Sequence, residues 1–255
     1  MTGNPTMRIT FIGGGNMATA LITGLARRGP ITDSVRVCDP DAGVRERLAG
    51  DFGIRGHAGP QGAVEDADMV VLAVKPQVMS AVLGELAGRL GPEQLVLSVA
   101  AGITTNRIRG ALGGDRPVVR AMPNTPALRG AGVTGLYASS ACGERHRAAA
   151  EEVLGAAGET VWVDDEALMD AVTAISGSGP AYFYLLAEAL REAGAALGLP
   201  PETANLLARA TAHGAGVMLH EEDADAAEDG GFRKLVLEAA RAAERRGREL
   251  AEDEA

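Results

Sequence analysis

The sequence is poor in aromatic residues, cysteine and lysine, and it has no long apolar run. Aromatic residues make up 3% of the 255 residues, which is too few for a stacking platform that binds single-stranded nucleic acid. The two cysteines, Cys38 and Cys142, are far apart, so we expect reduced thiols in a cytoplasmic protein. Only two of the 24 basic residues are lysines, Lys75 and Lys234, so a lysine at either position is an uncommon choice.

The charge balance and the missing apolar run exclude several classes of partner. The formal net charge is −10 at pH 7, and the basic residues are spread along the chain, so we expect no nucleic-acid partner. No apolar run approaches the length of a transmembrane helix, so we expect no membrane partner. The four histidines are scattered among positions without other ligands, which predicts no metal site and no histidine acting as a general acid.

Short β-branched segments alternate with amphipathic helical segments between residues 7 and 163. Several strand candidates are apolar throughout, as expected when helices cover both faces of a sheet. The alternation predicts an α/β fold with a Rossmann-type doubly wound parallel sheet. The expected strands are Arg8–Ile12, Val35–Cys38, Met69–Val74, Leu95–Val99, Val118–Ala121, Val133–Tyr137 and Thr160–Val163. The expected helices are Asn16–Arg28, Ala42–Phe52, Gln77–Leu90, Thr105–Leu112 and Glu144–Ala157.

The pattern changes near residue 163, and we predict two domains, 1–163 and 164–255. The second part is rich in Ala, Leu and Glu and shows no strand pattern, so we expect it to be all α-helical. It has few aromatic side chains with which to fill a small core. We therefore expect its helices to pack against those of a second copy of the chain.

A glycine-rich motif lies where the first expected strand meets the first expected helix. Gly13, Gly15 and Ala18 form a G-x-G-x-x-A pattern, which is typical of dinucleotide-binding turns. Gly13 permits a tight turn, Gly15 permits close approach of a pyrophosphate, and Ala18 permits close packing of the helix on the strand. The alternative is a glycine-rich turn without a ligand.

Further candidate residues follow the later strands. Asp39 ends the second expected strand, where a carboxylate can accept hydrogen bonds from ribose hydroxyls and repel a 2′-phosphate. Alternatively, Asp39 or Asp41 caps the next helix. Lys75 and Pro76 leave the third expected strand at the edge where open α/β sheets bind ligands. Pro76 also suits the first turn of the helix that follows.

Two more strand exits carry small or polar residues. Residues 100–102, Ala-Ala-Gly, suit the close approach of a flat ring or a ribose. Asn124 and Thr125 lie between two prolines and are expected to be held rigidly, although ordinary turn chemistry explains them equally.

In the helical part, the Ser176-Gly-Ser-Gly179 segment interrupts a helical pattern, and Pro180 begins a new helix. Its hydroxyl and N–H groups predict a carboxylate pocket at a helix N-terminus, with Glu166 as a candidate acid facing it. The alternative is a kink needed only for packing.

Five segments in this order resemble the pyrroline-5-carboxylate reductases, the last enzymes of proline synthesis. The segments are Ile12–Ala18, Ala73–Gln77, Ala100–Thr104, Met122–Pro126 and Asp170–Ala181. The resemblance covers nearly the whole chain. It implies a Rossmann domain followed by a helical dimerisation and substrate domain, a homodimer that often assembles into a decamer, and a small imine carboxylate as substrate.

The resemblance also implies roles for individual residues. Gly14, Asn16, Met17, Ala73, Val74, Lys75 and Ala101 match cofactor positions, Asp39 and Asp41 match positions near the adenosine ribose, and Glu166 matches a substrate-side position. Together with the motif analysis, this predicts cofactor contacts by Gly13, Gly14, Gly15, Asn16, Met17, Ala18, Asp39, Asp41, Ala73, Val74, Lys75, Pro76, Ala101, Gly102 and Asn124. Substrate contacts are predicted for Glu166, Ser176, Gly177, Ser178 and Gly179. No residue is assigned as the catalytic acid or base, and the cofactor is NADPH or NADH, with Asp39 favouring NADH.

The sequence departs from the family pattern in two places. Residues 59–61, Gly-Pro-Gln, stand where the family often has an asparagine near the adenosine ribose. The family's Ser-Pro-Gly-Gly-Thr-Thr segment, which holds the substrate carboxylate, has no counterpart between Ala227 and Glu228. We predict a break in the chain there, with the two Cα atoms much farther apart than the ~3.8 Å of a trans peptide.

The predicted reaction is the reduction of 1-pyrroline-5-carboxylate to L-proline by hydride from NAD(P)H. One alternative is a β-hydroxyacid dehydrogenase or imine reductase, although such enzymes usually place a catalytic lysine on a helix of the second domain. Lys234, the sole lysine of that part, lies near the C-terminus. The other alternative is a non-catalytic nucleotide-binding relative that lacks the substrate loop.

Overall fold

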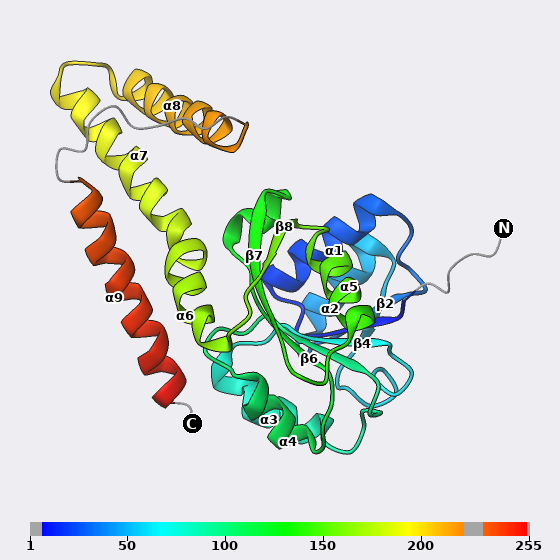
Figure 1. Cartoon of the computed structure of the whole chain (residues 1–255). Helices are drawn as coiled ribbons and strands as arrows, with labels where there is room; N and C mark the ends of the chain where they lie inside the picture. Colours follow the sequence, from blue (N-terminus) through cyan, green and yellow to red (C-terminus); the bar gives the residue numbers. More distant parts are fainter. Residues whose placement is uncertain (1–6, 222–231, 254–255) are drawn as a thin grey trace.

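A computed structural model describes residues 7–221 and 232–253 of the chain (Figure 1). Its eight-stranded sheet has the order β3-β2-β1-β4-β5-β6-β7-β8. The strands are β1 (Ile9–Ile12), β2 (Val35–Cys38), β3 (Arg55–His57), β4 (Met69–Leu72), β5 (Leu95–Ser98), β6 (Val118–Met122), β7 (Gly132–Ala138) and β8 (Gly158–Trp162). The helices of this part are α1 (Asn16–Arg28), α2 (Ala42–Phe52), α3 (Pro76–Leu86), α4 (Thr105–Leu112), the 3-10 helix η1 (Thr125–Arg129) and α5 (Glu144–Leu154).

Two apolar cores, one on each face of the sheet, explain why the central strands lack polar alternation. Phe11, Val71 and Leu97 point to the face that α1, α2 and α5 cover. Val70 and Leu72 point to the opposite face, under α3 and α4. All four residues of β1, β4 and β5 are therefore buried.

The predicted fold class is confirmed, with two differences in detail. The sequence analysis missed β3, because Arg55, Gly56 and His57 lack the apolar character of a strand and pair only at the sheet margin. The sheet is also not wholly parallel, because β7 runs antiparallel to β6. The alternation of strands and helices in a sequence does not fix the direction of each strand, so the sequence could not predict that β7 is antiparallel.

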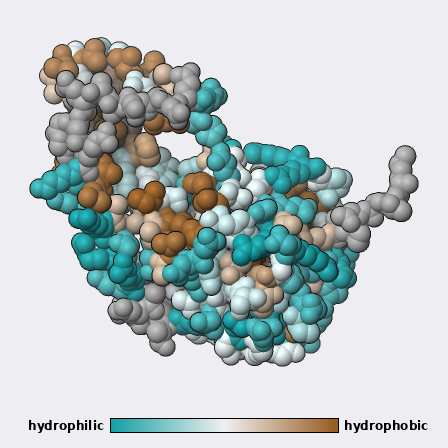
Figure 2. Space-filling model, in the orientation of Figure 1, coloured by the Kyte–Doolittle hydropathy of each residue, from teal (hydrophilic) through white to brown (hydrophobic). Residues whose placement is uncertain are grey.

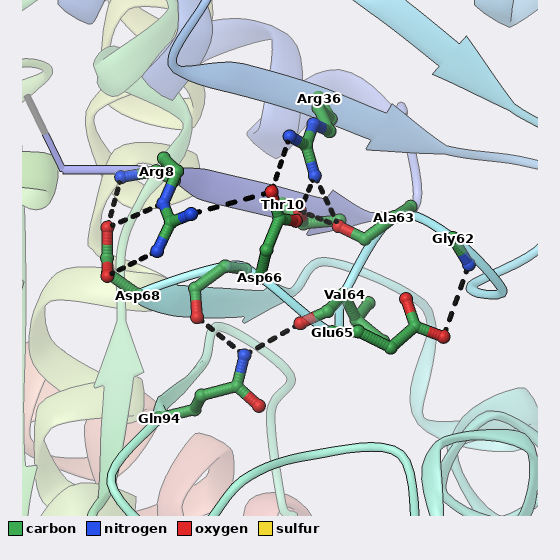
Figure 3. A network of polar contacts seen from close by, with 11 residues as sticks. Arg8, Thr10, Arg36, Gly62, Ala63, Val64, Glu65, Asp66, Asp68 and Gln94 are labelled. Atoms are coloured by element: carbon green, nitrogen blue, oxygen red, sulfur yellow. Dashed lines mark hydrogen bonds and ion pairs between the residues drawn. The ribbon is translucent and has the colours of Figure 1, made fainter.

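A polar network fixes the helix-free connection from β3 to β4 (Figure 3). Asp66 pairs with the guanidinium groups of Arg8 and Arg36, and Asp68 pairs with Arg8 at 3.3 Å. Gln94 Nε2 donates to the carbonyl oxygens of Val64, at 2.7 Å, and Ala67, at 2.5 Å. The hydrogen bond from Arg36 lowers the pKa of Asp66. The network therefore holds the connection at the amino-terminal edge of the sheet.

The chain is helical from Glu166 onward in the part that the structure describes. Its elements are the 3-10 turn η2 (Glu166–Leu168), α6 (Met169–Val172), the π-helical turn η3 (Thr173–Gly177), α7 (Gly179–Ala196), α8 (Pro201–Glu221) and α9 (Phe232–Asp253). α7 extends away from the sheet, and α8 turns back and packs against α7. α9 packs against α6 and η3 (Figure 1). The predicted all-helical second part is thus confirmed, while the exact boundary at residue 163 stays a prediction.

Large apolar side chains remain exposed along the extended helices. Figure 2 shows apolar surface gathered over the outlying helices α7 and α8. On α7, Phe183, Tyr184 and Leu185 are each more than 60% exposed. Among the described residues, no apolar partner covers this surface, and exposed apolar surface of this kind normally marks an interaction site.

None of the helices in the described residues is long and apolar enough to cross a membrane.

Candidate functional site

The carboxyl ends of neighbouring parallel strands meet along one edge of the sheet. The register pairs Ile12 with both Cys38 and Leu72, and it pairs Leu72 with Ser98. The segments that follow these residues therefore leave the sheet side by side. This is the edge at which open α/β sheets bind their ligands.

The glycine turn after β1 is shaped by close contacts on one side and by open space on the other. Gly13 has φ of +94°, and a Cβ atom there would lie 2.6 Å from the carbonyl oxygen of Ala73. A Cβ atom at Gly14 would lie 2.5 Å from Val44 Cγ1. At Gly15 a Cβ atom would have no other atom within 4 Å. The turn thus packs tightly at its base and leaves room for a ligand above Gly15.

The N-terminus of α1 faces the same space. Its N-cap residue makes no side-chain cap hydrogen bond, and its first turn has no acidic residue. The N–H of Thr19 bonds back to Gly15 at 2.9 Å, so the N–H groups of Asn16, Met17 and Ala18 precede the helical ladder. Ala18 is fully buried, as close packing on the strand requires. These residues fit a dinucleotide pyrophosphate, which helix N-termini bind readily.

Asp39 lies beside the glycine turn and ties it to the start of α2. Its Oδ2 accepts the N–H of Gly14 at 2.8 Å, and its Oδ1 accepts the N–H of Asp41 at 2.9 Å. Asp41 caps α2 by accepting the N–H of Gly43 at 2.8 Å. The cap alternative thus holds for Asp41, while the ribose contact of Asp39 stays a prediction.

The loops after β4 and β5 complete the edge near the glycine turn. Pro76 begins α3 and Lys75 is its exposed N-cap residue. Within the described part of the chain, no ion pair involves Lys75. Gly102 has φ of +75° and is half-buried beside Ala101. The small residues Ala101 and Gly102, and a lysine without an ion-pair partner among the described residues, therefore line this part of the edge.

Asn124 follows β6 and is bound by protein at both ends of its amide. Its Oδ1 accepts the N–H of Val133 at 3.0 Å, and its Nδ2 donates to the carbonyl oxygen of Ser176 at 3.1 Å. The side chain is buried between β7 and the π-helical turn. A cofactor contact by Asn124 stays a prediction.

Glu166 lies against the start of α4 rather than alone in a pocket. Its Oε1 accepts the N–H of Thr105 and its Oε2 accepts the hydroxyl of Thr105, both at 2.8 Å. Arg120 Nη1 lies 3.4 Å from Glu166 Oε1, and Arg120 Nη2 lies 3.5 Å from Asp170 Oδ1. The predicted substrate contact by Glu166 is not tested by this geometry.

The Ser176–Gly179 segment does not break the helix but widens it into a π turn. The N–H of Ser178 donates to the carbonyl oxygen of Thr173 at 2.8 Å, an i→i−5 bond. A Cβ atom at Gly177 would lie 2.7 Å from Met122 Cε, so the turn packs directly on the end of β6. π turns are rare and often occur at functional sites. The sequence pattern thus indicated a real irregularity at this segment. The irregularity is one extra residue in a continuous helical run, not a break between two helices.

Sequence reasoning missed Thr105 and Arg120 as partners of Glu166, and Asp170 as the second carboxylate on Arg120. Arg120 is an arginine in a strand whose other residues are mainly apolar, and its side chain is 6% exposed. A charged residue in a buried strand requires a charged partner. That signal was available, but the sequence did not say which carboxylates would supply it.

The structure describes the first of the two departures from the family pattern but not the second. Residues 59–61 lie in the connection after β3, where Pro60 accepts the N–H of Ala63 at 3.0 Å. The predicted break between Ala227 and Glu228 lies outside the described residues.

Comparisons with known proteins match both parts of the chain. A family model described as NADP oxidoreductase coenzyme F420-dependent matches residues 8–102, and one described as Pyrroline-5-carboxylate reductase dimerisation matches residues 166–228. A pyrroline-5-carboxylate reductase from Pseudomonas aeruginosa is 46% identical, over 97% of this chain and 98% of the relative. The chain belongs to the pyrroline-5-carboxylate reductase family. The resemblance read from the sequence is thereby confirmed.

Solved structures agree with this family membership. A pyrroline-5-carboxylate reductase from Coxiella burnetii is 36% identical with a TM-score of 0.91, covering 96% of this chain and 99% of that chain. A pyrroline carboxylate reductase from Plasmodium falciparum, solved with NADP bound, has a TM-score of 0.83 at 24% identity and covers 98% of this chain and all of that chain. At that identity the second likeness shows the fold alone. The match to the dimerisation model indicates that this chain forms an oligomer.

Proposed function

We propose that this protein reduces 1-pyrroline-5-carboxylate to L-proline with a reduced nicotinamide dinucleotide. The observation that carries the proposal is the 46% identity to a pyrroline-5-carboxylate reductase along nearly the whole chain. It is supported by the geometry of the sheet edge, where the glycine turn, the Lys75 loop and the Ala101–Gly102 loop lie side by side.

The cofactor is held by the residues of this edge. The N–H groups at the start of α1 and the space above Gly15 receive the pyrophosphate. Asp39 and Asp41 would bind the adenosine ribose, and the loops at residues 73–76 and 101–102 would hold the nicotinamide half. When bound, the nicotinamide supplies the hydride; the protein aligns the two reactants and excludes water.

The π turn and the residues after it would hold the substrate. Ser176, Gly177, Ser178 and Gly179 are the residues that would bind the substrate carboxylate. The Ser176 hydroxyl, which donates to the carbonyl oxygen of Val172 at 2.9 Å, and the Ser178 N–H, which donates to that of Thr173, would have to exchange those bonds for it. A protonated imine is already electrophilic, so the reaction does not require a strong general acid. No side chain is therefore assigned as a general acid.

We place NADH ahead of NADPH, because Asp39 is held at the end of β2 by Gly14 and Asp41. A carboxylate oxygen accepts more than one hydrogen bond, so Asp39 retains capacity for ribose hydroxyls. Its negative charge opposes a 2′-phosphate.

The working assembly is a homodimer, with five dimers forming a decamer, and it is cytoplasmic. The exposed apolar face of α7 and α8 supports the dimer, because burial of such a face is the main driving force for association. The absence of any pairing between Cys38 and Cys142 suits a reducing compartment.

The test is an assay of the full chain with pyrroline-5-carboxylate and either NADH or NADPH. Oxidation of the dinucleotide that depends on the imine, together with formation of proline, is the expected result. A β-hydroxyacid such as 3-hydroxyisobutyrate with the oxidised cofactor serves as the comparison substrate. Turnover of the hydroxyacid alone, or nucleotide binding without any proline formation, would overturn the proposal. Lys234 gives no support to the hydroxyacid alternative, because its side chain is 81% exposed beside Glu238.

A further inference from the structure

Two buried polar side chains, one within β6 and one just after it, face the helical part of the chain. The side chain of Arg120 is 6% exposed, and Asn124 as a residue is 8% exposed. Both contact the helical segment that begins at Glu166, although they lie in the sheet part of the chain. A buried polar group without a partner is costly, so these contacts constrain where that segment can lie.

Asn124 satisfies a carbonyl group that the helix itself cannot. In an α-helix the carbonyl of Ser176 would accept the N–H of residue 180. Residue 180 is proline, which has no N–H. Asn124 Nδ2 donates to that carbonyl oxygen at 3.1 Å instead. The second end of the amide is bound to Val133 of β7, so the donor is fixed relative to the sheet.

Arg120 holds the start of the same segment. Its two terminal nitrogens reach Glu166 and Asp170, which lie one helical turn apart. Glu166 is also bound by the backbone N–H and the hydroxyl of Thr105, at the first turn of α4. Every hydrogen bond and ion pair of the Glu166 carboxylate among the described residues is therefore with the sheet part of the chain.

We propose that Arg120 and Asn124 are positioning residues that together fix the π turn Thr173–Gly177 against the cofactor edge. Arg120 sets the start of the segment through Glu166 and Asp170, and Asn124 sets its end through Ser176. Glu166 thus acts through Thr105 and Arg120 rather than by touching the substrate. The expected loss of activity rests on the proposed function, whereas the positioning of the π turn does not.

The chain offers a matched control for each residue. Gln94 is also a buried amide that donates to backbone carbonyls while its oxygen accepts a backbone N–H, from Gly91 at 2.6 Å. Arg116 is also a buried arginine, and it donates to the carbonyls of Leu112 and Gly113. Both controls lie away from the π turn. Gln94→Glu therefore matches Asn124→Asp, and Arg116→Met matches Arg120→Met.

The experiment compares these four full-chain variants with the wild type by steady-state kinetics, dinucleotide fluorescence titration and amide hydrogen exchange. Asn124→Asp and Arg120→Met should lower kcat/KM for the imine by roughly 10- to 100-fold, because misplacement of the reactants is costly. The Kd for the dinucleotide should change less than threefold, since the glycine turn is untouched. Amides of residues 170–179 should exchange faster than in the wild type.

The controls should lose thermal stability without either of those changes. The proposal is overturned if Gln94→Glu and Arg116→Met reproduce the kinetic and exchange effects, or if Asn124→Asp and Arg120→Met leave them unchanged. A wild type without activity would refute the proposed function instead, and the exchange measurement would still decide the positioning role.

Discussion

Asp39 accepts a backbone N–H on each carboxylate oxygen, from Gly14 and from Asp41, so its charge is held in one place. Asp39→Ser removes this charge and should narrow or reverse the preference for NADH over NADPH. The physical reason is the lost repulsion of a 2′-phosphate and the weaker acceptance of ribose hydroxyls. The measurement is the ratio of kcat/KM for the two cofactors. A wild type that already prefers NADPH strongly would show that Asp39 does not set the choice.

Gly14 and Gly15, neighbours in the first turn, allow a second prediction in which each variant is the control for the other. Gly14→Ala places a methyl group 2.5 Å from Val44 Cγ1, and overpacking of this kind costs about 1–3 kcal/mol of folding stability. Gly15→Ala meets no atom within 4 Å, so its thermal midpoint should stay near that of the wild type.

The methyl group of Gly15→Ala instead occupies the space assigned to the pyrophosphate. Its KM for the dinucleotide should rise by about tenfold, which corresponds to roughly 1.4 kcal/mol. Thermal melts and cofactor titrations of both variants are needed. Equal behaviour of the two variants in both measurements would refute the orientation of the turn described above.

At the scale of elements, the β3–β4 connection predicts a pH dependence of stability. Arg36 lowers the pKa of Asp66 through a hydrogen bond, so the stabilisation is present above the ordinary pKa of an aspartate and is lost as pH falls through the lowered one. The Asp66 side chain is 49% exposed, which limits the effect to about 1 kcal/mol or less. Asp66→Asn should therefore cost stability at pH 7 and progressively less as the pH falls below the ordinary pKa of an aspartate, measured by urea unfolding. Asp33→Asn, at an exposed loop position, is the control. A loss independent of pH would count against the ion pair.

Most elements were predictable from the sequence, because their apolar periodicity reflects burial. The helices Asn16–Arg28, Ala42–Phe52 and Thr105–Leu112 have the predicted bounds. β3 was not predictable, because its three residues are held by pairing with β2 rather than by apolar burial.

The site divides in the same way. The glycine turn has a local sequence signature, so its shape followed from the residues alone. Both partners of Glu166, and the Ser176 partner of Asn124, lie 46 to 61 residues away in the chain, and only the fold brings them together. Spacing along the sequence carries no information about such contacts.

At the scale of the whole molecule, the exposed face of α7 predicts how the oligomer can be broken. Leu185 is 65% exposed in the single chain. Leu185→Glu would place a charge in an apolar interface and should dissociate the assembly, since burial of one leucine contributes about 1.5–3 kcal/mol. Light scattering at micromolar concentration is the measurement. Leu128→Glu, an exposed leucine on the sheet part of the chain, should leave the mass unchanged. A folded, monodisperse wild-type monomer would contradict the expectation.

The π turn also sets an angle. Each residue advances a helix by about 100°, so the extra residue in Thr173–Gly177 rotates α7 by about that amount relative to an unbroken α-helix. The direction in which the apolar face of α7 points is therefore set by the same turn that packs on Met122. Deleting one residue of the turn would swing Phe183 and Leu185 around the helix axis while shifting the segment at the sheet edge. A change in the π turn would therefore alter both its packing on the end of β6 and the direction that the exposed apolar face of α7 takes.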